Sequence, residues 1–170
     1  LGPMVTWQCR RTAGLCDELR ARGAGDLVLR RTGLALDPMF SATKLRWLVD
    51  ALPEGRARAA RGELCGGTVD SWLLHRLTDG ASFACDVSNA SRTGLLDLAT
   101  AAWSSDLLAL FDVPVEILPT LRPSSGVVGH TVVRGRLPGG LPIAALVGDS
   151  HAALFAHGGH KPGLVKATYG

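Results

Sequence analysis

Cysteine pairs at metal-binding spacing are absent from this sequence. The chain has four cysteines in 170 residues, namely Cys9, Cys16, Cys65 and Cys85. None of them forms a C-x-x-C pair or accompanies a pair of histidines at ligand spacing. A structural zinc site needs such pairs because one ion takes its four ligands from short turns. With 46% hydrophobic residues, the chain can bury a hydrophobic core without needing disulfide bonds for stability. We therefore expect free, mostly buried thiols in a protein of the reducing cytoplasm.

Long apolar runs and an excess of charge are also missing. No run approaches the ~18 apolar residues that a membrane-spanning helix requires, and no secretory signal precedes the first predicted helix. The formal net charge is only +3, which is typical of a solvated surface and not of a nucleic-acid-binding one. We expect neither a membrane nor a nucleic acid as a partner.

Metal-ligand spacing is missing from the histidines near the end of the chain as well. His151 and His157 are six residues apart and would not share a face of a helix. Two glycines separate His157 from His160, and His130 stands alone. We therefore predict no metal ion bound by the protein itself.

Helical and extended patterns alternate along the chain, which predicts the α/β class. Amphipathic spacing and stop signals predict helices at 12–22, 26–31, 41–52, from 68 or 70 to 79, at 104–111 and at 150–157. Extended segments are expected at 4–8, 81–93, 121–133, 141–147 and 164–168. We expect helix caps at Thr12, Ser41 and Ser104, and core positions for Trp47, Trp72 and Trp103.

An aspartate follows the apolar run 141–147 (L-P-I-A-A-L-V), which predicts a strand buried on both faces. Asp149 comes after Gly148, which would let the backbone turn sharply, and it opens the next helix. Open α/β sheets bind ligands at the carboxyl ends of their strands, which is where Asp149 would lie. Kinases that phosphorylate a hydroxyl need a carboxylate there to accept the proton of the attacking oxygen. An aspartate at this position can equally cap the helix, and spacing alone does not decide between the two.

Seven blocks of sequence occur in an order that resembles one known family. They are W-Q-C-R-R-T-A (7–13), T-G-L with D-P (32–38), F-S-A-T-K-L-R-W-L (40–48), G-G-T-V-D-S-W-L (66–73), D-V-S-N-A-S-R-T (86–93), L-P with R-P-S-S-G (118–126) and P-I-A-A-L-V-G-D-S-H-A-A-L-F (142–155). Together they resemble the FGGY carbohydrate kinases, and among these most of all the glycerol kinases. One block alone would be weak, but seven in one order are specific.

The resemblance implies an actin-like, ribonuclease H-like ATPase fold of two domains with a cleft between them. Residues 1–158 would form the latter part of the first, substrate-binding domain, and residues 159–170 the start of the second, ATP-binding domain. The implied reaction is ATP-dependent phosphorylation of a hydroxyl of glycerol or a related polyol or sugar, with Mg²⁺ accompanying the nucleotide. A homo-oligomeric parent is compatible with the resemblance.

The resemblance also assigns residues to the site. It makes Asp149 the catalytic base, in contact with the substrate. Trp7 matches the tryptophan that lines the carbon backbone of the substrate in glycerol kinases. Met39 stands where they carry a tyrosine, and Ser150 where they carry a glutamine. Because methionine cannot donate a hydrogen bond and serine is shorter than glutamine, we expect an acceptor other than glycerol, either another polyol or a small sugar.

Parts of the family pattern are missing from the sequence. The Asp-Gly-Thr phosphate-binding hairpin and the glycine-rich adenosine-binding turns are not found, so no nucleotide-binding residue is assigned. Phosphoryl transfer depends on such parts, and we expect this chain to be an internal piece of a kinase that is inactive by itself. A non-catalytic remnant that serves as a binding module is the alternative. The order of the motifs disfavours an unrelated α/β domain.

Overall fold

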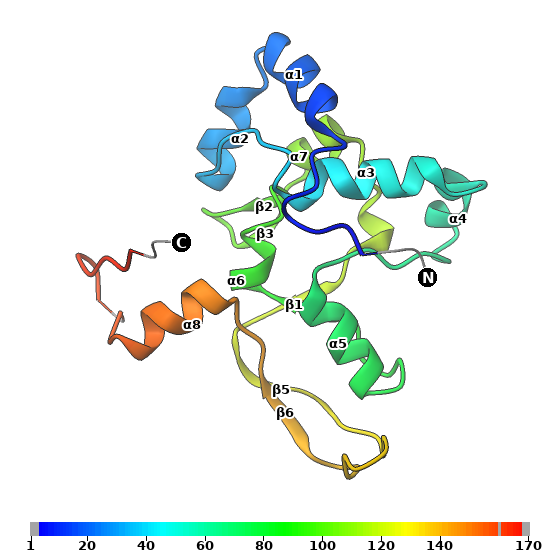
Figure 1. Ribbon diagram of the computed structural model, residues 1–170, viewed down its shortest axis with the longest axis vertical. Coiled ribbons are helices and arrows are strands. Elements are labelled where there is room, and N and C mark those ends of the chain that lie inside the picture. The colour runs from blue at the N-terminus through cyan, green and yellow to red at the C-terminus, as the bar shows by residue number, and fades with distance from the viewer. Residues whose placement is uncertain (1–3, 160, 168–170) are drawn as a thin grey trace.

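A computed structural model describes residues 4–159 and 161–167 of the chain. In sequence order its helices are α1 (Ala13–Ala21), α2 (Gly25–Thr32), α3 (Ser41–Ala51), α4 (Gly55–Ala60), α5 (Val69–Leu77), α6 (Val87–Ala90), α7 (Ser105–Phe111) and α8 (Asp149–Ala156), with a 3₁₀ turn at Val115–Ile117. The strands are β1 (Ala84–Asp86), β2 (Leu96–Asp97), β3 (Ala102–Trp103), β4 (Thr120–Arg122), β5 (Ser125–His130) and β6 (Pro142–Ala145). Figure 1 shows a helical body with two extensions, the β5–β6 hairpin and α8.

The helical body packs around one hydrophobic core. Its buried members come from α1 to α4, from α7 and from the 3₁₀ turn, and they include Cys16, Val28, Leu45, Leu107 and Phe111. The predicted helices are confirmed to within a few residues. Two short helices, α4 and α6, are additional, and α6 lies within the segment 81–93 that was expected to be extended. The helix α3 thus contributes directly to the core, with Ala42, Leu45 and Val49 buried in it.

Two of the three predicted caps differ from expectation. Ser104 does cap α7, because its hydroxyl oxygen accepts from the N–H of Leu107 at 3.4 Å. Thr12 holds the N-cap position of α1, but its hydroxyl pairs with that of Thr43 at 2.8 Å instead. The N-cap of α3 is Phe40, so Ser41 is the first helical residue and not a cap. Hydrogen bonding across the core outweighs the local capping preference at Thr12.

One parallel strand pair lies beneath the helices and supports the α/β prediction. β1 pairs with β4 in parallel register from Ala84 opposite Thr120 to Asp86 opposite Arg122. All three residues of β1 are buried, and α5 packs against the strand. The connection from β1 to β4 passes through α6, the antiparallel pair β2–β3 and α7. A parallel pair requires such a long crossover, and it brings Asp86 to the carboxyl end of a buried strand.

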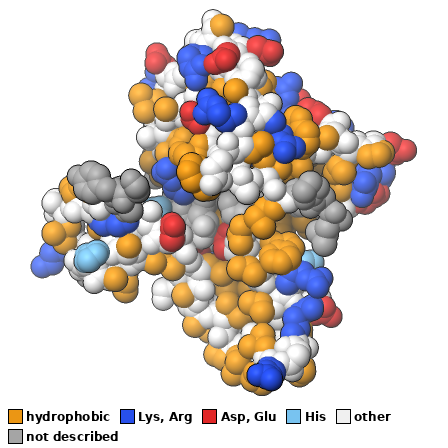
Figure 2. Space-filling view, viewed as in Figure 1, with side chains coloured by type: hydrophobic (Ala, Val, Ile, Leu, Met, Phe, Trp, Pro, Cys, Tyr) orange, Lys and Arg blue, Asp and Glu red, His pale blue; other side chains and the backbone are white. Residues whose placement is uncertain are grey.

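The predicted doubly buried strand at 141–147 is wrong. β6 covers only Pro142–Ala145, is mostly exposed and pairs antiparallel with β5. Leu141 and Val147 are 45% and 42% exposed. The hairpin reaches away from the body, and hydrophobic side chains spread over this part of the surface in Figure 2. Among the described residues, β6 has one partner strand only, so its apolar side chains lack the second layer that the prediction assumed.

Two further extended segments were expected and are not observed. Residues 4–8 form a loop and turn, and Trp7 is 66% exposed. Residues 164–167 are irregular, while Thr168, the end of that predicted strand, lies outside the described residues, as does His160. A strand needs a neighbour to satisfy its backbone, and within the described chain neither segment has one.

Most tryptophans and some cysteines lie at the surface instead of in the core. Trp47 and Trp72 are 38% and 46% exposed. The guanidinium of Arg11 lies 4.3 Å from the Trp47 ring centroid, a cation–π contact that suits a surface position. Trp103 is half-buried, and its indole N–H donates to the carbonyl of Pro119 at 3.0 Å. Of the four free thiols, Cys16 and Cys85 are buried, Cys9 is partly buried and Cys65 is exposed.

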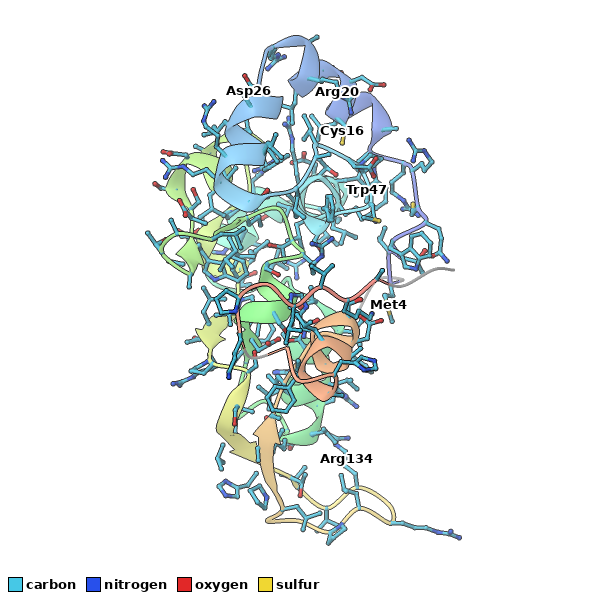
Figure 3. All side chains as sticks on the ribbon, turned by 90° about the vertical axis from the view of Figure 1, so that its left-hand side faces the viewer. Met4, Cys16, Arg20, Asp26, Trp47 and Arg134 are labelled. Carbon is cyan, nitrogen blue, oxygen red and sulfur yellow. The ribbon has the colours of Figure 1, made fainter. Side chains whose placement is uncertain are left out.

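The two ends of the molecule are distinct in the view of Figure 3, where Arg20 and Asp26 lie at one end and Arg134 at the other. Arg134 belongs to the hairpin connection and fixes it to the end of α5. Its guanidinium donates to the carbonyl of Arg76 at 2.6 Å and to the carboxylate of Asp79 at 3.0 Å. The hairpin is therefore braced on its α5 side. Within the described residues no helix is both long and apolar enough to span a bilayer.

Candidate functional site

Asp149 is the first residue of α8, directly after the hairpin, and its side chain is exposed. Gly148, and not Asp149, holds the N-cap position, with φ −66° and ψ 143°. The Asp149 Oδ1 atom accepts from the N–H of Ser150 at 2.6 Å. Its carboxylate therefore binds one free backbone donor of the first turn of α8, where the helix dipole favours a negative charge.

Gly148 does not make the sharp turn that was expected from the sequence. Its backbone is extended, a conformation that any residue adopts. Its N–H donates to the Oγ of Ser88 at 2.7 Å. A Cβ atom at this position would lie 3.3 Å from Nδ1 of His151 and 3.5 Å from Oγ of Ser88. These are ordinary or slightly tight contacts, so the hydrogen bond to Ser88, and not the lack of a Cβ, is what joins the start of α8 to α6.

A buried carboxylate supports this contact. Asp86 is 0% exposed and caps α6. Its carboxylate accepts from the N–H of Ser88 at 2.9 Å, from the N–H and the side-chain amide of Asn89 at 3.1 and 2.7 Å, and from the hydroxyl of Ser124 at 2.6 Å. Burial by itself would raise the pKa of Asp86, but the hydrogen bonds from Ser124, Ser88 and Asn89 favour the charged form and hold the pKa below its ordinary value of 3.8.

Acid is expected to weaken the fold through Asp86. Because the pKa in the folded chain lies below 3.8, the stabilisation is complete above that value and is lost as the pH falls through the lowered folded pKa. Asp86→Asn should flatten this acid dependence. It should also lower the free energy of unfolding at neutral pH by about 1–3 kcal/mol, because an amide cannot accept from all of these donors.

Urea denaturation of the chain from about pH 6 to about pH 3 measures both effects. Asp26→Asn is the matched control, since Asp26 is an exposed carboxylate in the first turn of α2. The interpretation is wrong if Asp86→Asn leaves the same acid slope as Asp26→Asn.

Lys44 connects the backbone segments that carry Trp7 and Met39, two of the predicted substrate-binding residues. It lies on α3 and is only 5% exposed. Its ammonium donates to the carbonyl oxygens of Thr6 at 2.7 Å, Trp7 at 3.4 Å and Met39 at 3.0 Å. Burial lowers the pKa of Lys44. One buried cation thus holds together the two segments that carry Trp7 and Met39, whose side chains are 66% and 40% exposed.

Lys44→Met is expected to loosen the Trp7 and Met39 segments. Methionine fills similar space but donates no hydrogen bond, and hydrogen bonds from a charged group contribute about 1.5–3 kcal/mol. The free energy of unfolding should fall by that amount in urea denaturation. The control is Arg46→Met on the same helix, where Arg46 pairs with Asp50 at 3.6 Å on the surface. That loss should stay below about 0.5 kcal/mol, and equal losses would contradict the role given to Lys44.

The 86–93 segment contacts residues adjacent to three of the predicted site residues, Asp149, Ser150 and Met39. Its start receives the N–H of Gly148, next to Asp149. At its end, the carbonyl of Thr93 accepts from the N–H of Ala42 at 2.8 Å. The Arg92 guanidinium lies 5.2 Å from the ring centroid of Phe40, next to Met39. The segment is therefore the physical link between Asp149–Ser150 and Met39, and through Lys44 it reaches Trp7.

Lys44, Asp86 and Ser88 lie within the motif blocks, but the sequence alone assigned no role to any of them. For Asp86 a signal existed, because an aspartate followed by serine and asparagine is a typical start of a capped turn. For Lys44 there was none, since a lysine on a helix is ordinarily solvated. Their roles depend on partners up to 60 residues away in the sequence.

Ser150 lies on the wall of a hollow beside α8. The hollow measures about 230 Å³ and is lined by Ser150, His151, Leu154 and Lys166. It is open to solvent, and most of its lining is apolar. Within the described ranges no group of three or more His, Cys, Asp or Glu side chains lies close enough to hold a metal ion. The residues at hand therefore do not form a magnesium site.

Comparisons with known proteins identify relatives over almost the whole chain. The sequence profile of the FGGY family of carbohydrate kinases, N-terminal domain, matches residues 1–156. A glycerol kinase of Alkalilimnicola ehrlichii is 53% identical over 166 residues, which are 98% of this chain and 33% of that protein. Glycerol kinase 1 of Thermotoga maritima is 47% identical over 166 residues, 98% of this chain and 34% of its own length. The chain spans about a third of the curated relatives it matches.

Solved structures share the fold. The crystal structure of Plasmodium falciparum glycerol kinase with ADP superposes with a TM-score of 0.82 at 27% identity, covering 91% of this chain and 31% of that one. A xylulose kinase from Rhodospirillum rubrum gives a TM-score of 0.74 at 27% identity, covering 90% and 31%. The helices and strands described above are thus arranged as in one part of these larger enzymes.

Proposed function

Since this chain belongs to the FGGY family of carbohydrate kinases, with the fold of the actin-like ATPase kinases, we propose that it forms the acceptor-binding part of a kinase that phosphorylates a polyol. The observation that carries the proposal is the exposed carboxylate of Asp149 at the start of α8, directly after Gly148, whose N–H donates to Ser88, in a chain 53% identical to a glycerol kinase. The acceptor is glycerol or a related polyol or sugar, and the activity belongs to the longer enzyme.

Asp149 acts as the general base in this proposal. Its carboxylate accepts the proton of the acceptor hydroxyl and orients the attacking oxygen. Trp7 supplies an apolar wall for the carbon backbone of the acceptor, and Met39 and Ser150 complete the pocket.

ATP, accompanied by Mg²⁺, is the proposed phosphoryl donor, as the family description of carbohydrate kinases implies. Because the described residues offer no cluster of metal ligands, we assign the nucleotide and its ion mainly to parts of the enzyme beyond this chain. Residues 1–158 are proposed as the latter part of the substrate-binding domain, and 159–170 as the start of the ATP-binding domain. A homo-oligomeric cytoplasmic parent is part of the same proposal.

A chimeric kinase tests the proposal. In this enzyme, the chain replaces the matching 166 residues of the Alkalilimnicola ehrlichii glycerol kinase. ADP release is measured with glycerol, tetritols, pentitols and ketoses as acceptors, and the unmodified relative is the positive control. We expect acceptor-dependent ADP release. A folded chimeric kinase that binds ATP but phosphorylates no acceptor would support the non-catalytic binding module instead.

A further inference from the structure

The start of α8 is attached to a segment 60 residues earlier in the sequence. The N–H of Gly148 donates to the hydroxyl oxygen of Ser88 at 2.7 Å. Ser88 is 8% exposed, so water competes little for this contact. Gly148 directly precedes Asp149 in the chain. The hydrogen bond therefore fixes the peptide that carries the base.

Ser88 is itself held in place by the buried carboxylate of Asp86. The backbone N–H of Ser88 donates to Oδ2 of Asp86 at 2.9 Å, while two donors of Asn89 bind Oδ1. A serine on a surface loop would be free to rotate and shift, but here the backbone beneath the hydroxyl is locked to a fully buried group. The position of the Ser88 hydroxyl is thus set by the core and not by solvent.

A second connection runs from Asp86 to the same place. The Ser124 hydroxyl donates to Asp86 at 2.6 Å, and the carbonyl of Ser124 accepts from the N–H of Leu146 at 3.1 Å. Leu146 and Gly148 flank the last residue of the apolar run before Asp149. Two chains of hydrogen bonds from one buried carboxylate therefore end within three residues of the base. Since the hairpin itself is exposed and reaches away from the body, these bonds join its carboxyl end to the buried strand β1.

We propose that Ser88 is a positioning residue for Asp149, so that its hydrogen bond to Gly148 sets where the carboxylate meets the acceptor hydroxyl. This inference rests on the proposed function. A general base must lie within hydrogen-bond reach of the proton it accepts, and a displacement of about 1 Å can cost two orders of magnitude in rate. Loss of the single neutral hydrogen bond between Ser88 and Gly148 should displace the Asp149 carboxylate by less than this distance. We therefore expect a ~5–30-fold fall in turnover when the Ser88 hydroxyl is removed.

The test compares three variants of the chimeric kinase. Ser88→Ala removes the acceptor of the Gly148 N–H and leaves the backbone cap of Asp86 intact. Ser88→Thr keeps the hydroxyl and should restore turnover to within about threefold. Ser91→Ala is the matched control, because the Ser91 hydroxyl donates to the carbonyl of Ser88 at 2.7 Å and so lies on the same turn without contact to Gly148. Ser91→Ala should leave turnover nearly unchanged, and the KM for ATP should stay within about twofold in all three.

A double-variant experiment separates positioning from general loosening. If Ser88 acts through Asp149, Ser88→Ala should cost nothing further in the Asp149→Asn background, because there is no base left to position. An equal fold loss in both backgrounds would overturn the inference. So would full turnover of Ser88→Ala in the otherwise unchanged chimeric kinase.

Hydrogen exchange of the Gly148 amide gives a readout that does not need activity. Exchange should be at least ~10-fold faster in Ser88→Ala than in Ser91→Ala, since only the first loses the acceptor of that N–H. Unchanged exchange overturns the positioning role, whatever the enzyme does. An inactive chimeric kinase with the expected exchange difference instead counts against the proposed function, so the two failures are distinguishable.

Discussion

Asp149→Asn in the chimeric kinase is expected to lower turnover by ~10²–10⁴-fold, the usual scale for losing a positioned general base. Asparagine keeps the shape of the side chain and can still accept from the N–H of Ser150, which is the contact that Asp149 makes in the structure. It cannot take a proton. The expected loss is therefore one of chemistry and not of folding, and the affinity for ATP should stay close to unchanged.

The control for Asp149→Asn is Asp26→Asn. Both aspartates are exposed and lie in the first turn of a helix, so both substitutions remove a charge that the helix dipole favours. If Asp149 serves only the helix terminus, the two variants should behave alike. A fall in turnover of less than about fivefold for Asp149→Asn would falsify its assignment as the base.

Glycerol use is expected to improve ~10–100-fold in kcat/KM when Met39→Tyr and Ser150→Gln are combined. The resemblance to glycerol kinases implies a tyrosine and a glutamine at these positions, which reach further with polar groups than methionine and serine do. A hydrogen bond contributes about 0.5–1.5 kcal/mol, or roughly tenfold per 1.4 kcal/mol. Met39 is 40% exposed and Ser150 is exposed, so the larger side chains have room. The unchanged chimeric kinase should use glycerol poorly beside tetritols, pentitols and ketoses.

Steady-state kinetics with this set of acceptors measures the change. Met39→Leu is the control, because it alters the shape of the side chain without adding a donor. Its effect on glycerol should be small, and its order of acceptor preference should stay that of the unchanged chimeric kinase. We expect the Alkalilimnicola ehrlichii relative to prefer glycerol. The prediction is wrong if the unchanged chimeric kinase shows the same preference.

The structure changes the picture of how the site is held together. From the sequence, the pocket consists of residues at the ends of separate elements. In the structure, the 86–93 segment lies between them and contacts both Gly148 and Ala42. Its anchor, Asp86, is fully buried and accepts four hydrogen bonds. Such a network is sensitive to substitution because each lost partner leaves a buried polar group unpaired.

The sequence by itself determined where most helices lie and which family the chain belongs to. Helix spacing and stop signals placed most helices correctly, because 3.6-residue periodicity is a local property. The order of seven motif blocks identified the carbohydrate kinases, and the match over residues 1–156 confirmed this. The position of Asp149 at the start of a helix also followed from local signals, namely an apolar run, a glycine and a new helical pattern.

Only the tertiary structure decided burial and partnership. The run 141–147 is as apolar as a doubly buried strand, yet β6 is mostly exposed and pairs with β5 alone among the described residues. Lys44 has the sequence signature of a solvated residue, yet it is buried against three carbonyl oxygens. Ser88 meets Gly148 across 60 residues. Burial and long-range contacts depend on which distant segments of the chain pack against a residue. A local pattern of a few residues does not contain that information.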